Sequence, residues 1–97
     1  MKPVVEETAD EKGNYEWWCP GCQSYHSFWH RAAGRPSWSW NTDLVKPTVS
    51  PSILTRTGPK LQERCHVFLK AGKIQYLGDC THDLAGKTVD MIPVDDI

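Results

Sequence analysis

The 97-residue chain is predicted to fold as one small β-rich domain, all-β or α+β, with at most one short helix. Three observations predict this class: the chain is too short for two domains, apolar and polar residues alternate over several short runs, and glycines and prolines separate those runs. Residues 1–14 are polar and are expected to form a flexible N-terminal arm. The domain itself is expected over residues 15–97.

Short strands are expected along the whole domain. Residues 37–40 alternate strictly between Ser and Trp, which is the period of a half-buried strand. Residues 47–54 read as extended but contain two prolines, so an edge strand or an ordered loop is expected there. The other elements are expected at residues 15–18, 64–70, 73–79 and 87–93 for strands, and at 81–86 for a single helical turn.

The strands on either side of Ala71-Gly72 are expected to form a hairpin. A two-residue turn pairs Lys70 with Lys73, and counting back from this pair places alternate residues on opposite faces. The more apolar face, expected to be the core side, carries Cys65, Val67, Leu69, Ile74, Tyr76 and Cys80. The other face carries His66, Phe68, Gln75, Leu77 and Asp79.

The sequence Cys19-Pro20-Gly21-Cys22 is the most specific chemical motif. Proline and glycine between two cysteines form a tight turn that aims both sulfurs at one point, as a tetrahedral Zn²⁺ requires. Two more ligands are expected on the core side of the hairpin, which joins a knuckle to a hairpin as in a zinc ribbon. The predicted ligands of this structural zinc are Cys19, Cys22, Cys65 and Cys80, with His82, His66 and His26 as alternates.

Three other interpretations of the cysteines stay open. Four cysteines is an even count, which would allow two disulfides in an oxidising compartment. Trp18 followed by CPGC also resembles the redox turn of thioredoxins, although no βαβ pattern accompanies it. Buried free thiols are the third interpretation.

His66 and Asp79 form a second candidate site on the other face of the hairpin. The register makes them diagonal neighbours, and an Asp that orients a His is the start of an acid–base or metal arrangement. An ordinary cross-strand polar pair accounts for the same spacing. With His82 added, an open metal site would activate water, so the alternative function is a small metal-dependent hydrolase or nuclease that uses His66, Asp79 and His82.

Five tryptophans are more than so small a core needs, so part of them is expected at the surface. Aromatic faces beside small hydrogen-bonding groups are typical of binding surfaces. The predicted partner-binding residues are Trp38, Trp40, Asn41, Thr48, Ser50 and Ser52. Tryptophans also stack on bases, so a second alternative function is a single-stranded nucleic-acid binder. Packing in the core accounts for the tryptophans equally well.

Charge and hydropathy exclude several classes of function. Lys+Arg number 11 against 12 Asp+Glu, so the net charge of −1 argues against a strongly basic nucleic-acid-binding arm. No apolar run approaches the roughly 20 residues of a membrane helix, and the N-terminus has no signal-peptide pattern. We therefore expect a cytoplasmic protein with no membrane partner.

The motifs WWCPGCxxxH, WSWN, PTxSPSI, RCHxFxxxGxIQxLxDCTHxLAG and TVDMIP, taken as a set, resemble a family of small uncharacterised proteins found in tailed phages and prophages. Members are often mislabelled as ammonia monooxygenases, which are membrane proteins. The resemblance covers residues 15–93, and the chain departs from it at Gln23 and Thr42, where the family has Gly.

The resemblance implies a zinc-ribbon-like fold, an intracellular protein made in an infected bacterial cell, and an accessory role beside bacterial ubiquitin-like conjugation genes. Its signature residues here are Cys19, Cys22, His26, Trp40, Asn41, Pro47, Pro51, Ser52, Cys65, His66, Gly72, Asp79, Cys80 and His82. The leading expectation is a non-enzymatic zinc-binding domain, encoded by a phage, that binds a protein partner such as a host factor.

Overall fold

Two antiparallel β-sheets make up the computed structural model, which describes all of residues 1–97. The smaller sheet has the order β1 (Glu6–Glu7), β2 (Asn14–Cys19) and β3 (Ser24–Trp29). The larger sheet has the order β4 (Ser39–Trp40), β5 (Val49–Thr57), β6 (Glu63–Lys70), β7 (Lys73–Tyr76) and β8 (Thr88–Asp90). A 3-10 turn at Val94–Asp96 (η1) is the only helix, so the predicted β-rich class is confirmed. No helix is long and apolar enough to cross a membrane.

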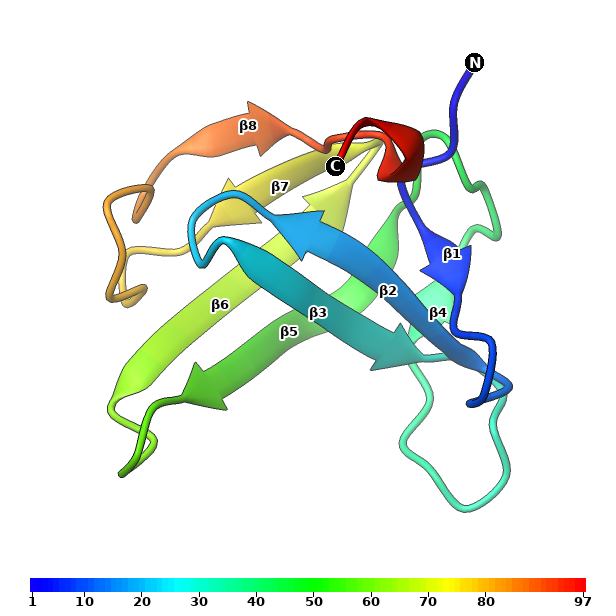
Figure 1. Ribbon diagram of the computed structural model, residues 1–97, viewed down its shortest axis with the longest axis horizontal. Helices are drawn as coiled ribbons and strands as arrows, with labels where there is room; N and C mark the ends of the chain where they lie inside the picture. Colours follow the sequence, from blue (N-terminus) through cyan, green and yellow to red (C-terminus); the bar gives the residue numbers. More distant parts are fainter.

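The core lies between the two sheets, and β2 and β3 cross in front of β5 and β6 in Figure 1. Trp17 and Phe28 contribute the largest buried side chains of the smaller sheet, and Leu69, Ile74 and Tyr76 those of the larger. Each of these side chains is less than 2% exposed. Alternation along each strand supplies this apolar inner face, and burying it is the main source of stability for a β-domain.

The predicted hairpin is confirmed in its turn and in its register. Lys70 pairs with Lys73, and both turn residues have positive φ, Ala71 at 49° and Gly72 at 80°. Such a turn matches the twist of the two strands, which favours a two-residue hairpin loop. The face predicted to be the core side is buried at every position, namely Cys65, Val67, Leu69, Ile74, Tyr76 and Cys80.

Strand β7 is shorter than predicted because the chain turns away from the ladder after Tyr76. The Leu77 N–H still donates to the His66 carbonyl at 2.9 Å, but the Cys80 N–H donates to the Leu77 carbonyl at 3.2 Å and closes a turn. Residues 81–86 continue as turns without a helix, in contrast to the single helical turn that was expected. This local turn shifts every residue from 78 onward out of the register of the hairpin.

Residues 1–14 belong to the fold, which differs from the flexible arm expected from their polar composition. Val5 is completely buried, and the Val4 N–H donates to the Leu44 carbonyl at 2.8 Å. Strand β1 then pairs with β2 through Glu6 and Glu16. Two adjacent valines therefore dock this segment, because their burial and the strand pairing outweigh the polarity of the rest.

Candidate metal centre and candidate active site

Four side chains from three separate segments form a Cys₃His cluster. The cluster consists of Cys19 at the end of β2, Cys22 in the turn after it, Cys65 in β6, and His82 in the turn after β7. Their ligand atoms all lie within 4.8 Å of one another. The Sγ atoms of Cys19 and Cys65 are 3.8 Å apart, and Nε2 of His82 lies 3.4 Å from Sγ of Cys65.

The geometry and the donor set of this cluster fit Zn²⁺. Two thiolates at the usual Zn–S distance of roughly 2.3 Å, separated by a tetrahedral angle, have sulfurs about 3.8 Å apart. The same separation is found between Cys19 and Cys65. Three sulfurs and one imidazole nitrogen are a ligand set of structural zinc sites, and four protein ligands leave no position for a substrate.

Hydrogen bonds favour a thiolate at Cys19, the form in which cysteine binds metal. The hydrogen bond with the Cys65 thiol is the largest influence that lowers the pKa of Cys19, and contacts with His26 and Tyr76 lower it further against the effect of burial. The same hydrogen bond raises the pKa of Cys65. Burial raises the pKa of Tyr76, so its hydroxyl stays protonated 3.1 Å from Sγ of Cys19.

Cys80, predicted as the fourth ligand, lies outside the cluster, and His82 stands in its place. The turn after Leu77 causes this exchange because it removes Cys80 from the ladder position on which the prediction depended. The Cys80 thiol instead contacts the backbone of His66. It accepts from the His66 N–H at 3.3 Å and donates to the His66 carbonyl at 3.3 Å. His26 is also outside the cluster and packs edge-on against Trp17, with ring centroids 5.2 Å apart.

Gly21 gives the His82 ring the space that it occupies. A Cβ at this position would lie 2.4 Å from Cε1 of His82, too close for any real contact. We therefore expect Gly21→Ala to displace His82 and to weaken zinc binding about 10- to 100-fold, the range seen when the support of a ligand is lost. Competition with a chromogenic chelator measures this change.

Gly78→Ala is the matched control, since a Cβ at Gly78 would meet nothing within 4 Å. The two variants add the same methyl group to turns on either side of the cluster. Equal zinc affinity in the two would contradict the assignment of His82 as a ligand.

The second candidate site lies on the opposite, outer face of β6. Nδ1 of His66 is 3.1 Å from Oδ2 of Asp79, so the prediction that these two residues are neighbours is confirmed. On the other side of the ring, Nε2 of His66 is 2.9 Å from Oγ of Ser52. Nη1 of Arg64 also reaches Asp79, at 3.5 Å. The result is a continuous hydrogen-bonded chain from Ser52 through His66 to Asp79.

Pairing between β5 and β6 brings Ser52 to the histidine. Leu54 stands opposite His66, and Ser52, two residues earlier, therefore shares its face as a diagonal neighbour. The register of β5 shifts between Val49 and Ile53, which is an irregularity of the kind that redirects side chains beside active sites. Because Leu54 and His66 are far apart in the sequence, no local pattern indicates this pairing. Ser52 was expected only as a partner-binding residue.

Asp79 is the negative partner that orients His66. Partial desolvation would raise the pKa of Asp79, but the hydrogen bond from His66 and the charges of His66 and Arg64 lower it overall. An ionised Asp79 accepts a hydrogen bond from Nδ1–H of His66, which leaves Nε2 of the ring free to accept a hydrogen bond from the Ser52 hydroxyl. His82, the third member of the metal-hydrolase hypothesis, belongs to the Cys₃His cluster on the inner side.

Most of the other predicted partner-binding residues hold the 38–50 segment together. The Asn41 side chain organises the loop through three hydrogen bonds, in one of which its Oδ1 accepts from the Thr48 N–H at 3.1 Å. Oγ1 of Thr48 accepts from the Ala71 N–H at 2.9 Å. Trp40 packs on Tyr15 with ring centroids 4.7 Å apart, and Ser50 is exposed opposite Ser39. Their role in contacting a partner stays a prediction.

Trp38 contacts the backbone of the triad formed by Ser52, His66 and Asp79. Its indole N–H donates to the carbonyl of Ser52 at 3.3 Å. Among the five tryptophans, Trp17 alone is completely buried, and the other four are partly exposed. Trp17 therefore fits the core interpretation, and a binding role for the partly exposed tryptophans stays a prediction.

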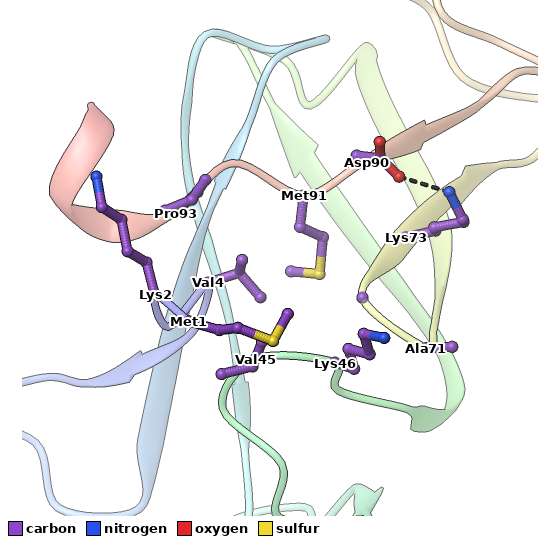
Figure 2. A pocket seen from close by; sticks show the side chains of 11 residues that line it. Met1, Lys2, Val4, Val45, Lys46, Ala71, Lys73, Asp90, Met91 and Pro93 are labelled. Carbon is purple, nitrogen blue, oxygen red and sulfur yellow. Dashed lines mark hydrogen bonds and ion pairs between the residues drawn. The ribbon is translucent and has the colours of Figure 1, made fainter.

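None of the five hollows on the molecule is lined by Ser52, His66 or Asp79. Figure 2 shows one of about 550 Å³ beside the N-terminus, where Met1 and Met91 point toward its interior and the Lys73–Asp90 ion pair stands at its rim. The triad instead lies on an open sheet surface, which suits a large partner better than a small molecule.

The fold and the cluster together define a small two-sheet β-domain with a Cys₃His cluster, compatible with a zinc-ribbon-like protein. Within that class, the chain belongs to the family described as bacterial ubiquitination-like system serine protease (BubE), whose match covers residues 2–77. The match includes Ser52 and His66 and ends two residues before Asp79. No curated protein and no solved structure matches the chain.

Proposed function

We propose that this protein is a small serine peptidase of a bacterial ubiquitination-like system. In this proposal Ser52 is the nucleophile, His66 the general base and Asp79 the residue that orients it. The single observation that carries the proposal is the hydrogen-bonded chain, with 2.9 Å from Ser52 to His66 and 3.1 Å from His66 to Asp79. The description of the family supports the same chemistry.

The arrangement performs acyl transfer in two steps. Nε2 of His66 takes the hydroxyl proton as Oγ of Ser52 attacks the scissile carbonyl, and the resulting imidazolium gives that proton to the leaving amine. An ester between Ser52 and the substrate's acyl group remains. Water, deprotonated by His66, then attacks this ester, and the proton returns to Oγ of Ser52 as the acid is released.

The Cys₃His cluster supports this site structurally in the proposal. Zn²⁺ bound there supplies a cross-link between chain segments. Cys65 directly precedes His66, and His82 follows Asp79 by three residues, so the same cross-link fixes the two segments that carry the base and its orienting residue. The Cys80 thiol holds the His66 backbone from the remaining side.

The proposal replaces the sequence-based expectation of a non-enzymatic binding domain. The sequence alone does not indicate a nucleophile beside His66, because the contact between Ser52 and His66 is seen only in the structure. It also differs from the metal-dependent hydrolase, because the side chain of His82 belongs to the cluster and not to the group around His66. The expected protein partner becomes the protein substrate, and we keep a phage origin and a host substrate as parts of the proposal.

A fluorophosphonate probe tests the nucleophile directly. We expect the wild-type protein to be labelled at Ser52, as located by mass spectrometry, and the Ser52→Ala variant to remain unlabelled. Ser39→Ala is the control, since Ser39 is an exposed serine of the neighbouring strand β4 without side-chain hydrogen bonds. An unlabelled wild-type protein, or equal labelling of Ser52→Ala, would refute the serine mechanism.

A further inference from the structure

We infer that the substrate is an extended polypeptide segment that adds to the sheet as a strand, antiparallel to β5 and paired with the backbone of Leu54 and Arg56. This inference rests on the proposed function, because it places the scissile bond of that segment beside Ser52. It concerns how the substrate is recognised, which the triad alone does not determine.

The first step is the direction of the backbone groups in β5. The carbonyl of His66 accepts from the Leu77 N–H at 2.9 Å, so the backbone groups of His66 face the side of β7. Its partner Leu54 therefore belongs to a non-hydrogen-bonded pair of the β5–β6 ladder. The N–H and C=O of Leu54 consequently point away from β6.

Arg56 repeats this arrangement two residues later. It stands opposite Arg64, whose carbonyl accepts from the Thr81 N–H at 2.9 Å on the far side of β6. Because backbone direction alternates along a strand, Leu54 and Arg56 present their N–H and C=O groups to the same edge. Two successive donor–acceptor pairs are thus available at the spacing that an added strand requires.

The second step is that this edge has no partner in the structure. Strand β4 pairs with β5 only through Val49 and Ser50. No loop or side chain forms a hydrogen bond with the backbone of Leu54 or Arg56, and both residues are exposed, Leu54 by 49%. Figure 1 draws no strand beside the arrowhead half of β5 on the side away from β6. An edge of this kind is a template for strand addition.

The third step is that the edge leads to the nucleophile. Ser52 lies two residues before Leu54. Its carbonyl oxygen accepts a hydrogen bond from the indole N–H of Trp38 at 3.3 Å. The free edge therefore ends where the Ser52 hydroxyl stands. A strand added antiparallel to β5, at the usual spacing of about 4.8 Å, would run from Arg56 toward Ser52. The residues before the scissile bond would line the edge, and the leaving segment would pass Trp38.

The edge is expected to bind an extended polypeptide of variable sequence, because recognition here uses main-chain groups. No hollow surrounds the triad to select a small molecule. Charge adds one side-chain preference. Arg56 is exposed and has no ion-pair partner, whereas Arg64 is paired with Asp79. We expect the segment to carry an acidic residue about four positions before the scissile bond, opposite Arg56.

Two variants of Leu54 test the pairing with a random dodecapeptide library as the substrate. Leu54→Pro removes the leucine side chain and an N–H that the ladder does not use, and proline is accepted on such an edge. Leu54→Ala removes the same side chain but keeps the N–H. Each variant is measured for library cleavage by mass spectrometry and for the rate of fluorophosphonate labelling. We expect the ratio of cleavage to labelling to be at least about tenfold lower in Leu54→Pro than in Leu54→Ala.

Equal ratios in the two variants would overturn the strand-addition inference and leave the serine chemistry standing. The same holds for a wild-type protein that is labelled but leaves the library intact. Absence of labelling in the wild type would instead refute the proposed function. Arg56→Glu should replace the preference for an acidic residue by one for a basic residue, and an unchanged preference would contradict the assigned direction.

If Leu54→Pro does not fold, amide exchange on the Ser52→Ala variant decides the question without catalysis. Addition of the library should slow exchange of the Leu54 and Arg56 amides, which are free in the unbound protein. The Ile53 and Thr55 amides, which face β6, serve as the internal reference. Unchanged exchange at Leu54 and Arg56 would overturn the inference.

Discussion

Removal of zinc is expected to unfold the protein. Structural zinc contributes roughly 10–16 kcal/mol in zinc-finger peptides, which equals or exceeds the roughly 5–15 kcal/mol by which domains are stable. The cluster joins the turn after β2 to β6 and to the turn after β7, so a metal bound there would connect both sheets. A strong chelator should abolish the cooperative thermal transition seen by circular dichroism, and metal analysis should find one zinc per chain.

Single cysteine variants identify the ligands in the same assay. Cys65→Ser should purify without stoichiometric zinc, whereas Cys80→Ser should keep it, because the Cys80 thiol contacts the His66 backbone and not the cluster. The two substitutions make the same chemical change at two buried sites. Loss of zinc from Cys80→Ser as well as from Cys65→Ser would favour the four-thiolate set predicted from the sequence. A metal-free protein with an unchanged melting temperature would contradict a structural role.

Replacement of the base or of its orienting residue is expected to have the largest effect on activity. His66→Ala and Asp79→Asn should each lower kcat/KM by about 10³- to 10⁴-fold, because the hydroxyl of Ser52 then has no correctly oriented acceptor for its proton. The rates of peptide hydrolysis and of fluorophosphonate labelling measure this loss. Asp90→Asn is the control, since Asp90 pairs with Lys73 far from the triad in the sheet.

The pH dependence of kcat/KM tests the ionised state of Asp79. Because its contacts with His66 and Arg64 lower the pKa of Asp79, this carboxylate stays ionised at neutral and mildly acidic pH. Protonation of Asp79 should therefore make no contribution to the acid limb of the kcat/KM profile. An acid limb that contains a second protonation, assignable to Asp79, would contradict its role as the ionised residue that orients His66.

Local patterns were sufficient for the hairpin but not for the sites that depend on distant pairing. The Ala71-Gly72 turn and the alternation from Cys65 to Tyr76 predicted the faces of β6 and β7. His66 and Asp79 are neighbours as predicted, but Asp79 lies in the turn that departs from the predicted register. The prediction was wrong about the length of β7, because the turn after Leu77 depends on hydrogen bonds that no periodicity expresses. That turn carries Cys80 away from the cluster and brings His82 to it.

Ser52 shows the limit most clearly. The two prolines that precede it indicated an edge strand or a loop, and β5 is indeed free along one edge beyond Pro51. What the sequence does not express is the partner strand, because the contact between Ser52 and His66 depends on a long-range register with an irregularity inside it. Residues 1–14 are a similar case, since two valines decide the docking of a stretch that is otherwise polar.

The alternation of Cys65 and His66 along one strand has a practical consequence for classifying the proposed peptidase. One residue points to the cluster and the next to the triad, so an agent that strips the metal or alkylates its ligands would also disorder the serine site. Phenanthroline and iodoacetamide would then inhibit cleavage as readily as a serine-directed reagent. A conventional inhibitor panel would report a metallopeptidase or a cysteine peptidase, and only the site of covalent labelling would identify the nucleophile.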